Sequence, residues 1–134
     1  MHKIDVKQVV CMHEILINQI GGLHGVKDVR LLDSAVNSIY QTFDGQELYP
    51  SVEQKAERLG YNLINNHAFI DGNKRVGMLA MLTFLEVNGV KLKYSDNELI
   101  EIGFSVATGA MHASDLHEWI QSHKIANKNN DMIK

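Results

Sequence analysis

The residues Asn66-His67-Ala68-Phe69-Ile70-Asp71-Gly72-Asn73-Lys74-Arg75 form a short polar loop between two apolar helical patterns. A loop that contains a glycine and leads into a buried helix directs several unpaired backbone N–H groups, together with the positive end of the helix dipole, toward one point. Lys74 and Arg75 fall in the first turn of that helix, where cations are unfavourable unless an anion neutralises them. The segment therefore predicts a site for an anion such as a phosphate group.

Three other side chains in or beside the loop bear on its chemistry. Asp71 offers a hard oxygen ligand for the Mg²⁺ that accompanies a polyphosphate. His67 precedes the loop and suits a base that takes a proton from an incoming hydroxyl, while the apolar Phe69 is expected to hold the loop to the core. An ordinary connector between two helices, with a capping Asp or Asn and exposed basic residues, has the same spacing. From the residues alone, a catalytic site and a plain connector both stay open.

Helical periodicity extends in both directions from the loop. Apolar residues recur at intervals of three and four, and serines followed by Gln or Glu three positions later form capping-box patterns. The sequence predicts helices over 6–20, 30–41 and 75–87, and helices that run from the caps Ser51, Ser95 and Ser114 to positions 66, 108 and 125. The expected fold is all-α, a bundle of about six helices in a single domain over 1–126, with a polar C-terminal tail over 127–134.

The composition is that of a globular domain that folds without a disulfide or a metal. The 134 residues are 45% apolar and 22% charged, and a chain of this length buries roughly 68% of its unfolded surface. The net charge of −3 argues against direct binding of nucleic acid or of an anionic membrane, and no stretch reads as a signal or a membrane span. The single cysteine, Cys11, is expected to be a small buried apolar residue, and its lack of a partner indicates the cytoplasm.

The loop resembles the signature of a known family. Its pattern H-x-F-x-D-G-N-K-R is similar to that of the Fic/Doc family, and the Lys before the Arg resembles the death-on-curing (Doc) toxin branch. The similarity covers about 6–122 and includes G-V-K-D at 25–28, L-L-D-S-A at 31–35, L-I-N-N at 63–66 and F-L-E-V-N-G at 84–89. The resemblance implies a small helical Fic fold with a short flap.

Three positions depart from H-P-F-x-D-G-N-G-R-x-x-R, the motif with which most Fic proteins bind ATP for transfer of AMP. Ala68 replaces the Pro, Lys74 replaces the Gly that widens the anion hole, and Met78 replaces the second Arg. The last two alter the cradle for the β- and γ-phosphates. In Doc toxins, which share the Lys, the nucleotide binds in the reversed orientation and the γ-phosphate is transferred. Gly72, where Doc sequences often have Ala, is closer to the general Fic pattern.

The resemblance implies a toxin of a type II toxin–antitoxin system. Such a kinase transfers the γ-phosphate of ATP, with Mg²⁺, to a Ser or Thr hydroxyl of a translation factor, with the elongation factor EF-Tu expected, and halts translation. By this resemblance His67 is the general base, Asp71 binds Mg²⁺ or the substrate hydroxyl network, and Arg75 joins them in catalysis. The phosphates are assigned to Gly72, Asn73, Lys74 and Arg75. Transfer of AMP to a protein hydroxyl and an inactive antitoxin-binding module remain alternatives.

The connector over 42–50 contains the turn signal Asp44-Gly45 between short apolar flanks, which predicts a small hairpin. By the resemblance, this flap, with Phe43 and Tyr49, aligns the target segment by strand addition. A plain connecting loop fits the same residues.

Control by a separate antitoxin is expected. The Fic self-inhibitory pattern [ST]-x-x-x-E-[GN] is most nearly matched from Ser114 to Glu118, but Trp119 follows where Gly or Asn is required. The disordered end of an antitoxin would instead fold onto exposed apolar residues near the first two helices or near Trp119.

Overall fold

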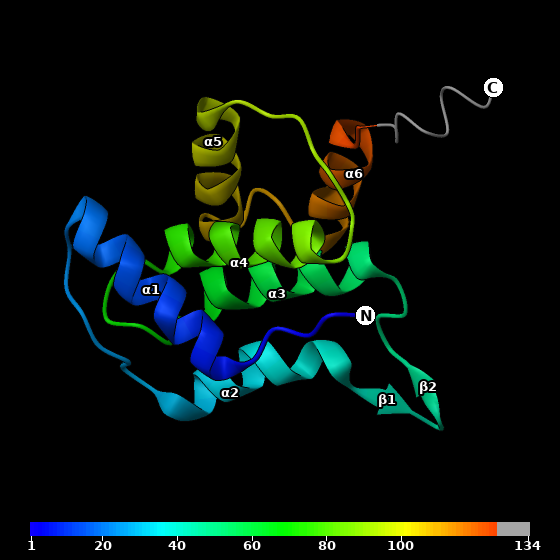
Figure 1. Ribbon diagram of the computed structural model, residues 1–134, viewed down its shortest axis with the longest axis horizontal. Helices are drawn as coiled ribbons and strands as arrows, with labels where there is room; N and C mark the ends of the chain where they lie inside the picture. The colour runs from blue at the N-terminus through cyan, green and yellow to red at the C-terminus, as the bar shows by residue number, and fades with distance from the viewer. Residues whose placement is uncertain (126–134) are drawn as a thin grey trace.

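The computed structural model describes residues 1–125, and the predicted tail over 127–134 lies outside them. The fold is all-α apart from one small hairpin, as the sequence predicts (Figure 1). In chain order the elements are α1 (Val6–Ile20), α2 (Val29–Asn37), the 3₁₀ turn η1 (Ser38–Tyr40), β1 (Thr42–Phe43), β2 (Gln46–Glu47), α3 (Val52–Asn66), α4 (Asn73–Val87), α5 (Asp96–Ala107) and α6 (Ala113–His123). Within residues 1–125, no helix is both long and apolar enough to cross a membrane.

Helices α3 and α4 form the centre of the molecule and run side by side (Figure 1). Two glycines allow their backbones to approach closely. A Cβ atom on Gly77 would lie 2.6 Å from Cγ1 of Ile64 and 3.0 Å from the carbonyl oxygen of Gly60. This tight pair places the loop between α3 and α4 at one end of a rigid core.

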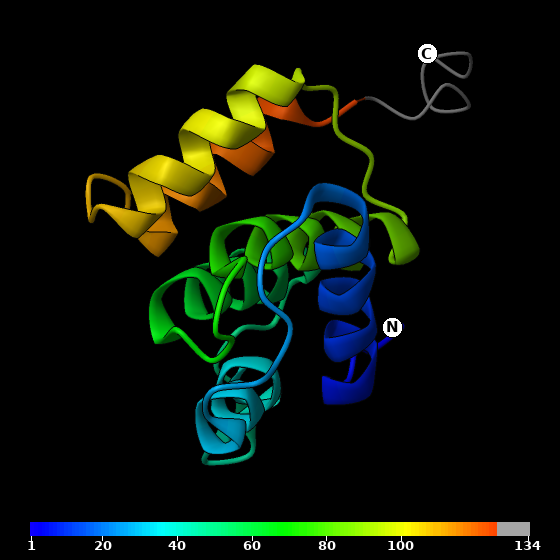
Figure 2. The same cartoon turned by 90° about the vertical axis from the view of Figure 1, so that its left-hand side faces the viewer.

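The remaining helices cover the central pair from two sides. Helices α5 and α6 lie together on one side, and α1 and α2 lie on the other (Figure 2). Fully buried side chains fill the space between these layers: Val9, Leu32, Ile39, Leu59, Leu63, Met81, Phe84, Val106, Leu116 and Ile120. The result is one continuous apolar core around α3 and α4.

Side-chain caps begin most of the helices, and two of the predicted capping boxes are confirmed. Ser51 with Gln54 caps α3, and Ser95 with Glu98 caps α5. The prediction for the last helix is wrong at its start, because His112 is the N-cap and not Ser114. The carboxylate of Asp115 accepts a hydrogen bond of 2.8 Å from the backbone N–H of His112, so the helix begins at Ala113, with its N-cap two residues before Ser114.

Other helix ends also differ from the predictions. Helix α2 ends at Asn37 and continues to Tyr40 as a 3₁₀ turn, and α4 begins at Asn73, two residues early. Helix α6 ends at His123 because the next residues are extended. The backbone N–H of Ile125 donates to the carbonyl oxygen of Lys91 at 2.9 Å, an interaction that a helical chain would not make.

Cys11 is exposed, so the expectation of a buried cysteine is wrong. The buried face of α1 runs through Val9, His13 and Ile17 at intervals of four. Position 11 lies two residues, and therefore about 200°, from position 9 on the helix, which turns it to solvent.

Candidate active site

The loop between α3 and α4 is held by backbone hydrogen bonds from the segment that follows α1. The carbonyl oxygen of Ala68 accepts hydrogen bonds from the N–H groups of Lys27 and Asp28 at 2.8 and 3.1 Å. The N–H of Ile70 donates to the carbonyl oxygen of Gly25 at 3.1 Å. We call residues 21–28 the adjoining segment. It is the neighbour of the loop in space although about 45 residues separate them in the sequence.

Asn73 fastens the loop from the other end. Its Nδ2 donates to the carbonyl oxygen of Phe69 at 3.0 Å, and its Oδ1 accepts from the Phe69 N–H at 3.1 Å. The ring of Phe69 is 1% exposed and stacks on His13 of α1, with ring centres 4.0 Å apart and planes 11° from parallel. Phe69 is thus part of the core. It anchors the start of the loop there, and Asn73 at the start of α4 is hydrogen-bonded to its backbone.

The carboxylate of Asp71 is exposed and fixed in direction. Its Oδ2 accepts from the backbone N–H of Leu23 at 3.1 Å and its Oδ1 from that of Gly72 at 2.8 Å. The bond from Leu23, which has the larger effect, and the bond from Gly72 lower the pKa of Asp71 below its ordinary value. The carboxylate is therefore ionised at neutral pH. Gly22 has φ 119°, a conformation that favours glycine, and a Cβ there would lie 2.6 Å from Oδ2 of Asp71.

The donor set at Asp71 fits one Mg²⁺ ion bound largely through a substrate. No group of three or more His, Cys, Asp or Glu side chains within residues 1–125 is arranged to enclose a metal ion. Mg²⁺ in phosphate-binding enzymes commonly takes one or two carboxylates and completes its shell with phosphate oxygens and water. A single exposed carboxylate that lines the same hollow as Lys74 and Arg75 meets that requirement.

The N-terminus of α4 has no side-chain cap, in contrast to α1, α2, α3 and α5. Its N-cap is Gly72 at φ 77°, and Lys74 and Arg75 in the first turn are exposed. A hollow of about 430 Å³ lies here, lined by Ile20, Gly21, Gly22, Asp71, Gly72, Asn73, Lys74 and Arg75. The uncapped N–H groups, the two cations and the Asp71 carboxylate therefore border one open space.

His67 follows α3 in the left-handed conformation, with φ 52° and ψ 44°. Non-glycine residues seldom adopt this conformation, and those that do cluster at functional sites. Its side chain is exposed. The structure thus presents an accessible imidazole at the entrance to the loop.

Lys74 and Met78 occupy different surroundings. The Lys74 ammonium lies 5.9 Å from the ring centre of Phe104 on α5, whereas Met78 is 6% exposed and faces Gly103 of the same helix. Position 78 is therefore part of the packing between α4 and α5.

The predicted flap forms a hairpin, but the structure does not bring it to the loop. Thr42 pairs with Glu47 and Phe43 with Gln46, and Phe43 is 76% exposed. The hairpin and the partly buried Tyr49 precede α3, whereas the loop follows it, and this helix of 15 residues is about 22 Å long (Figure 1). The adjoining segment occupies the place beside the loop.

His13 contacts the loop directly, although no motif in the sequence assigns it to the site. It is 2% exposed, and its Nε2 lies 2.7 Å from the carbonyl oxygen of Asp71. The signal in the sequence was a polar residue on the buried stripe of α1, between Val9 and Ile17.

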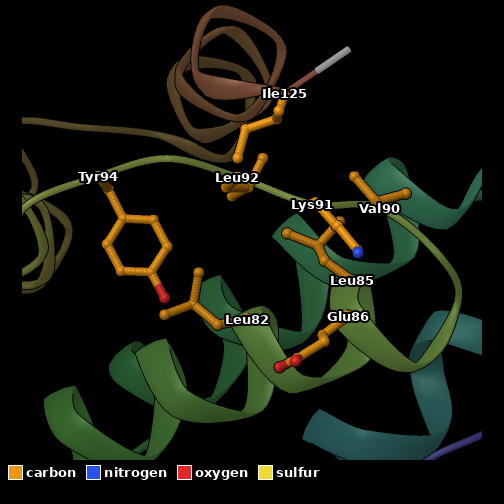
Figure 3. A pocket seen from close by; sticks show the side chains of 8 residues that line it. All are labelled: Leu82, Leu85, Glu86, Val90, Lys91, Leu92, Tyr94 and Ile125. Atoms are coloured by element: carbon orange, nitrogen blue, oxygen red, sulfur yellow. The ribbon is translucent and has the colours of Figure 1, made fainter. Parts of the chain in front are cut away.

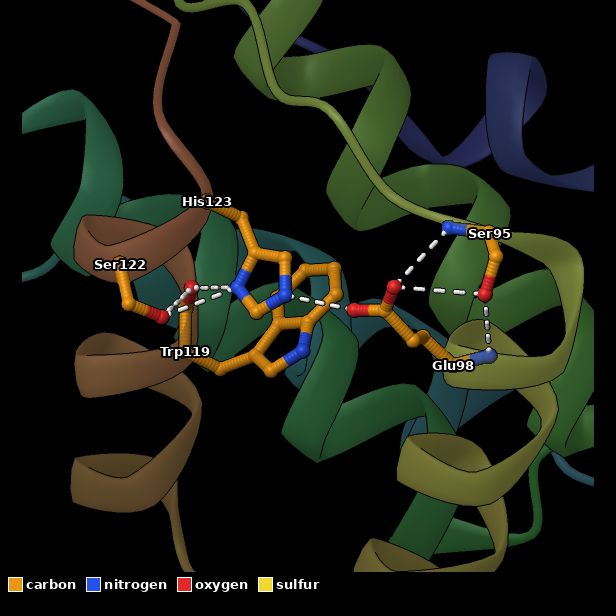
Figure 4. A network of polar contacts seen from close by, with 5 residues as sticks. All are labelled: Ser95, Glu98, Trp119, Ser122 and His123. Carbon is orange, nitrogen blue, oxygen red and sulfur yellow. Dashed lines mark hydrogen bonds and ion pairs between the residues drawn. The ribbon is translucent and has the colours of Figure 1, made fainter.

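Two features elsewhere lack the chemistry of an active site. A hollow of about 340 Å³ near the end of α4 is lined mainly by aliphatic residues, with Glu86, Lys91 and Tyr94 at its edge (Figure 3). Ser122, His123 and Glu98 resemble a catalytic triad (Figure 4). However, Nδ1 of His123 lies 2.7 Å from the carbonyl oxygen of Trp119 and donates to it, so it cannot take a proton from Ser122.

Comparison with known proteins identifies the family. The model described as the Fic/DOC family matches residues 3–85, which is more than half of the chain and includes the whole loop. The chain belongs to the Fic/DOC family. The Fic/DOC signature predicted from the loop is thereby confirmed.

Two relatives narrow the position within the Fic/DOC family. "Toxin Doc" of Mycolicibacterium smegmatis (strain ATCC 700084 / mc(2)155) is 46% identical over 72 residues, which is 54% of this chain and 55% of that protein. "Protein kinase doc" of Escherichia phage P1 is 26% identical over 121 residues, which is 90% of this chain and 94% of that protein. The chain thus spans about half the length of the first relative and nearly all of the second. Both are Doc proteins, in agreement with the predicted branch.

Proposed function

We propose that this chain is the toxin of a type II toxin–antitoxin system and a protein kinase. It transfers the γ-phosphate of Mg²⁺-ATP to a Ser or Thr hydroxyl of a translation factor, with the elongation factor EF-Tu as the expected target. The observation that carries the proposal is the uncapped N-terminus of α4, where Lys74 and Arg75 border the same hollow as Asp71. Phosphoryl transfer depends mainly on positioning and charge neutralisation, which this arrangement supplies.

Each residue of the site has a role that follows from its chemistry. Asp71 would hold Mg²⁺, which when bound neutralises phosphate charge. Arg75, Lys74 and the backbone N–H groups that follow Gly72 bind phosphate oxygens, and Asn73 holds the loop conformation through its two hydrogen bonds to Phe69. His67, exposed at the loop entrance, takes the proton of the target hydroxyl as its oxygen forms the new bond to phosphorus and the bond to ADP breaks.

Two departures from the general Fic motif favour phosphate transfer over AMP transfer. Lys74 adds a cation where most Fic proteins have Gly, and Met78 is packed against α5 where they have a second Arg. Both changes alter how the β- and γ-phosphates are held. Transfer of AMP to a protein hydroxyl stays the alternative chemistry, and an inactive antitoxin-binding module stays the alternative class.

The target segment has a more suitable neighbour than the hairpin. Leu23, His24 and Gly25 of the adjoining segment are exposed beside the loop. We therefore propose that strand addition to the adjoining segment, rather than to the hairpin at Phe43, aligns the target hydroxyl with His67.

An antitoxin is the proposed second partner. Exposed apolar side chains lie on α1, on the chain that follows it and at the start of α2: Ile15, Ile20, Leu23 and Val29 are each more than half exposed. A disordered antitoxin segment that folds onto this surface would cover apolar groups that now face water. Near Trp119, the exposed apolar residues Tyr94 and Ile125 offer a smaller surface.

The decisive experiment incubates the protein with EF-Tu and Mg²⁺-ATP and weighs the products by mass spectrometry. An added phosphate supports the kinase, an added AMP supports the alternative chemistry, and no adduct supports the inactive module. His67→Ala should lower the transfer rate by about 10²–10⁴-fold and abolish growth arrest while the helices remain folded. Undiminished transfer by this variant would refute the assignment of His67 as the base.

A further inference from the structure

His13 is a buried polar residue that contacts the backbone of the loop directly. It is 2% exposed, and its Nε2 lies 2.7 Å from the carbonyl oxygen of Asp71, 58 residues away. A carbonyl oxygen only accepts hydrogen bonds, so Nε2 carries the proton and donates. The imidazole also stacks on the buried ring of Phe69. His13 thus connects α1 to two residues of the loop, Phe69 in the core and Asp71 beside the hollow.

The bond determines which way the Asp71–Gly72 peptide faces. A trans peptide is planar, so its C=O and N–H groups point in opposite directions. With the Asp71 carbonyl directed to α1, the N–H of Gly72 points away from α1 and donates to Oδ1 of Asp71. The opposite orientation would turn carbonyl lone pairs toward the hollow, where they would repel phosphate oxygens.

Gly72 makes such a choice necessary. It has φ 77°, and a residue without Cβ adopts alternative backbone conformations at little cost. The backbone at Gly72 therefore permits either orientation of the preceding peptide. The bond from the Gly72 N–H to Oδ1 of Asp71 acts on this peptide from within the loop, and His13 is the donor on another helix that holds its carbonyl.

We propose that His13 is a positioning residue of the active site. Its Nε2–H holds the Asp71 carbonyl away from the hollow and so keeps the N-terminus of α4 able to bind phosphate. The inference rests on the proposed function, because it assumes that the hollow binds the phosphates of a nucleotide.

Two variants separate the hydrogen bond from the stack. His13→Phe keeps an aromatic ring against Phe69 and removes the donor. His13→Gln removes the aromatic ring and retains an N–H donor that reaches the position of Nε2. A role in core packing alone predicts that His13→Phe is the milder change, whereas the positioning role predicts the reverse for nucleotide binding.

The measurement is the dissociation constant for Mg²⁺-ATP, obtained by calorimetry on the full chain, with the melting temperature of each variant and the amide NMR resonance of Gly72. His13→Phe should weaken binding about tenfold, the equivalent of one lost hydrogen bond, and shift the Gly72 amide. His13→Gln should bind within about threefold of the wild type. His13→Leu, a smaller variant without a donor, serves in place of His13→Phe if that protein does not fold.

Each outcome bears on the inference. Equal affinity of wild type and His13→Phe would overturn it, and so would equal weakening in His13→Phe and His13→Gln, because the donor would then not matter. If the wild-type protein itself does not bind Mg²⁺-ATP, the proposed function fails. The two kinds of failure are distinguishable. Failure of the proposed function is seen in the wild type alone, whereas failure of the inference is seen by comparing the wild type with its variants.

Discussion

The side-chain amide of Asn73 satisfies both backbone polar groups of Phe69, with Nδ2 donating at 3.0 Å and Oδ1 accepting at 3.1 Å. One residue at the start of α4 thus closes the loop that leads into it. No other side chain of the same size has a donor and an acceptor side by side in this way. The backbone conformation between Phe69 and the start of α4 depends on this residue.

Asn73→Asp tests that dependence with almost no change in shape. The carboxylate keeps the acceptor for the Phe69 N–H but faces the Phe69 carbonyl with a second oxygen. We expect a loss of about 1–3 kcal/mol from the unpaired carbonyl, against a gain of about 0.3–1 kcal/mol from an anion at a helix N-terminus. The net result is a less stable protein, measured by urea unfolding, that also transfers phosphate more slowly. A variant as stable as the wild type would contradict this account of the loop.

Gly77→Ala should destabilise the centre of the fold. The new methyl group would lie 2.6 Å from Ile64 Cγ1, and the opposing backbone of Gly60 prevents α3 from moving away easily. We expect a decrease of about 1–3 kcal/mol in the free energy of unfolding, as is usual for an overpacked core.

Gly103→Ala is the matched control for that change. Gly103 also lies within a helix, but its added Cβ would meet Met78 Cγ at an ordinary distance of 3.4 Å. Because Ala is a better helix former than Gly by about 1 kcal/mol, this variant should be as stable as the wild type or more stable. Equal losses at both positions would show that close packing of α3 on α4 is not the cause.

Lys74→Gly tests the second departure from the general Fic motif. Removal of the ammonium takes away a cation from the hollow and widens it. We expect the rate of phosphate transfer to fall at least about tenfold, since a charge-assisted hydrogen bond to phosphate is lost. The products should be weighed for both adducts, because the wider hollow favours transfer of AMP. An unchanged rate of phosphate transfer would exclude Lys74 as a phosphate ligand.

The pairing of His123 with Glu98 makes the attachment of α6 to α5 sensitive to acid. The Nε2 of His123 lies 2.6 Å from Oε2 of Glu98, and this hydrogen bond is the main cause of the lowered pKa of Glu98 (Figure 4). A carboxyl group whose pKa is lower in the folded protein stabilises it above the unfolded pKa, and this contribution is lost as the pH falls through the folded pKa. The stability of the wild type should therefore fall below pH 4.5, the ordinary value for Glu.

Glu98→Gln checks this explanation because Gln can still complete the capping box with Ser95. The variant should melt at a lower temperature than the wild type at neutral pH, and the difference should shrink as the buffer is made more acidic. Glu101→Gln, at an exposed position of the same helix, is the control and should show no such pH-dependent difference. A difference for Glu98→Gln that stays constant from neutral to acidic pH would rule out the pairing as its cause.

Local rules in the sequence determined the helical elements and the position of the site. Capping boxes at Ser51 and Ser95 use residues three positions apart, and the signature from His67 to Arg75 is continuous in the chain. Such patterns act over one helical turn, so they can be predicted without knowledge of the fold. The error at the end of α6 arose where backbone hydrogen bonds with the distant segment at Lys91 and Lys93 outweighed local preference.

Tertiary structure alone decided what surrounds the loop. The bond between His13 and Asp71 joins residues 58 apart, and the adjoining segment, rather than the hairpin, lies beside the loop. The reason is that the hairpin and the loop lie at opposite ends of α3, whereas α1 packs on α4 and so brings the segment that follows α1 beside the loop. The order of residues in the chain thus specified the groups suited to phosphate chemistry. The packing of α1 against α4 set the backbone orientation of the loop and the segment that lies beside it. Contacts between residues so far apart in the chain leave no local sequence pattern from which they could be predicted.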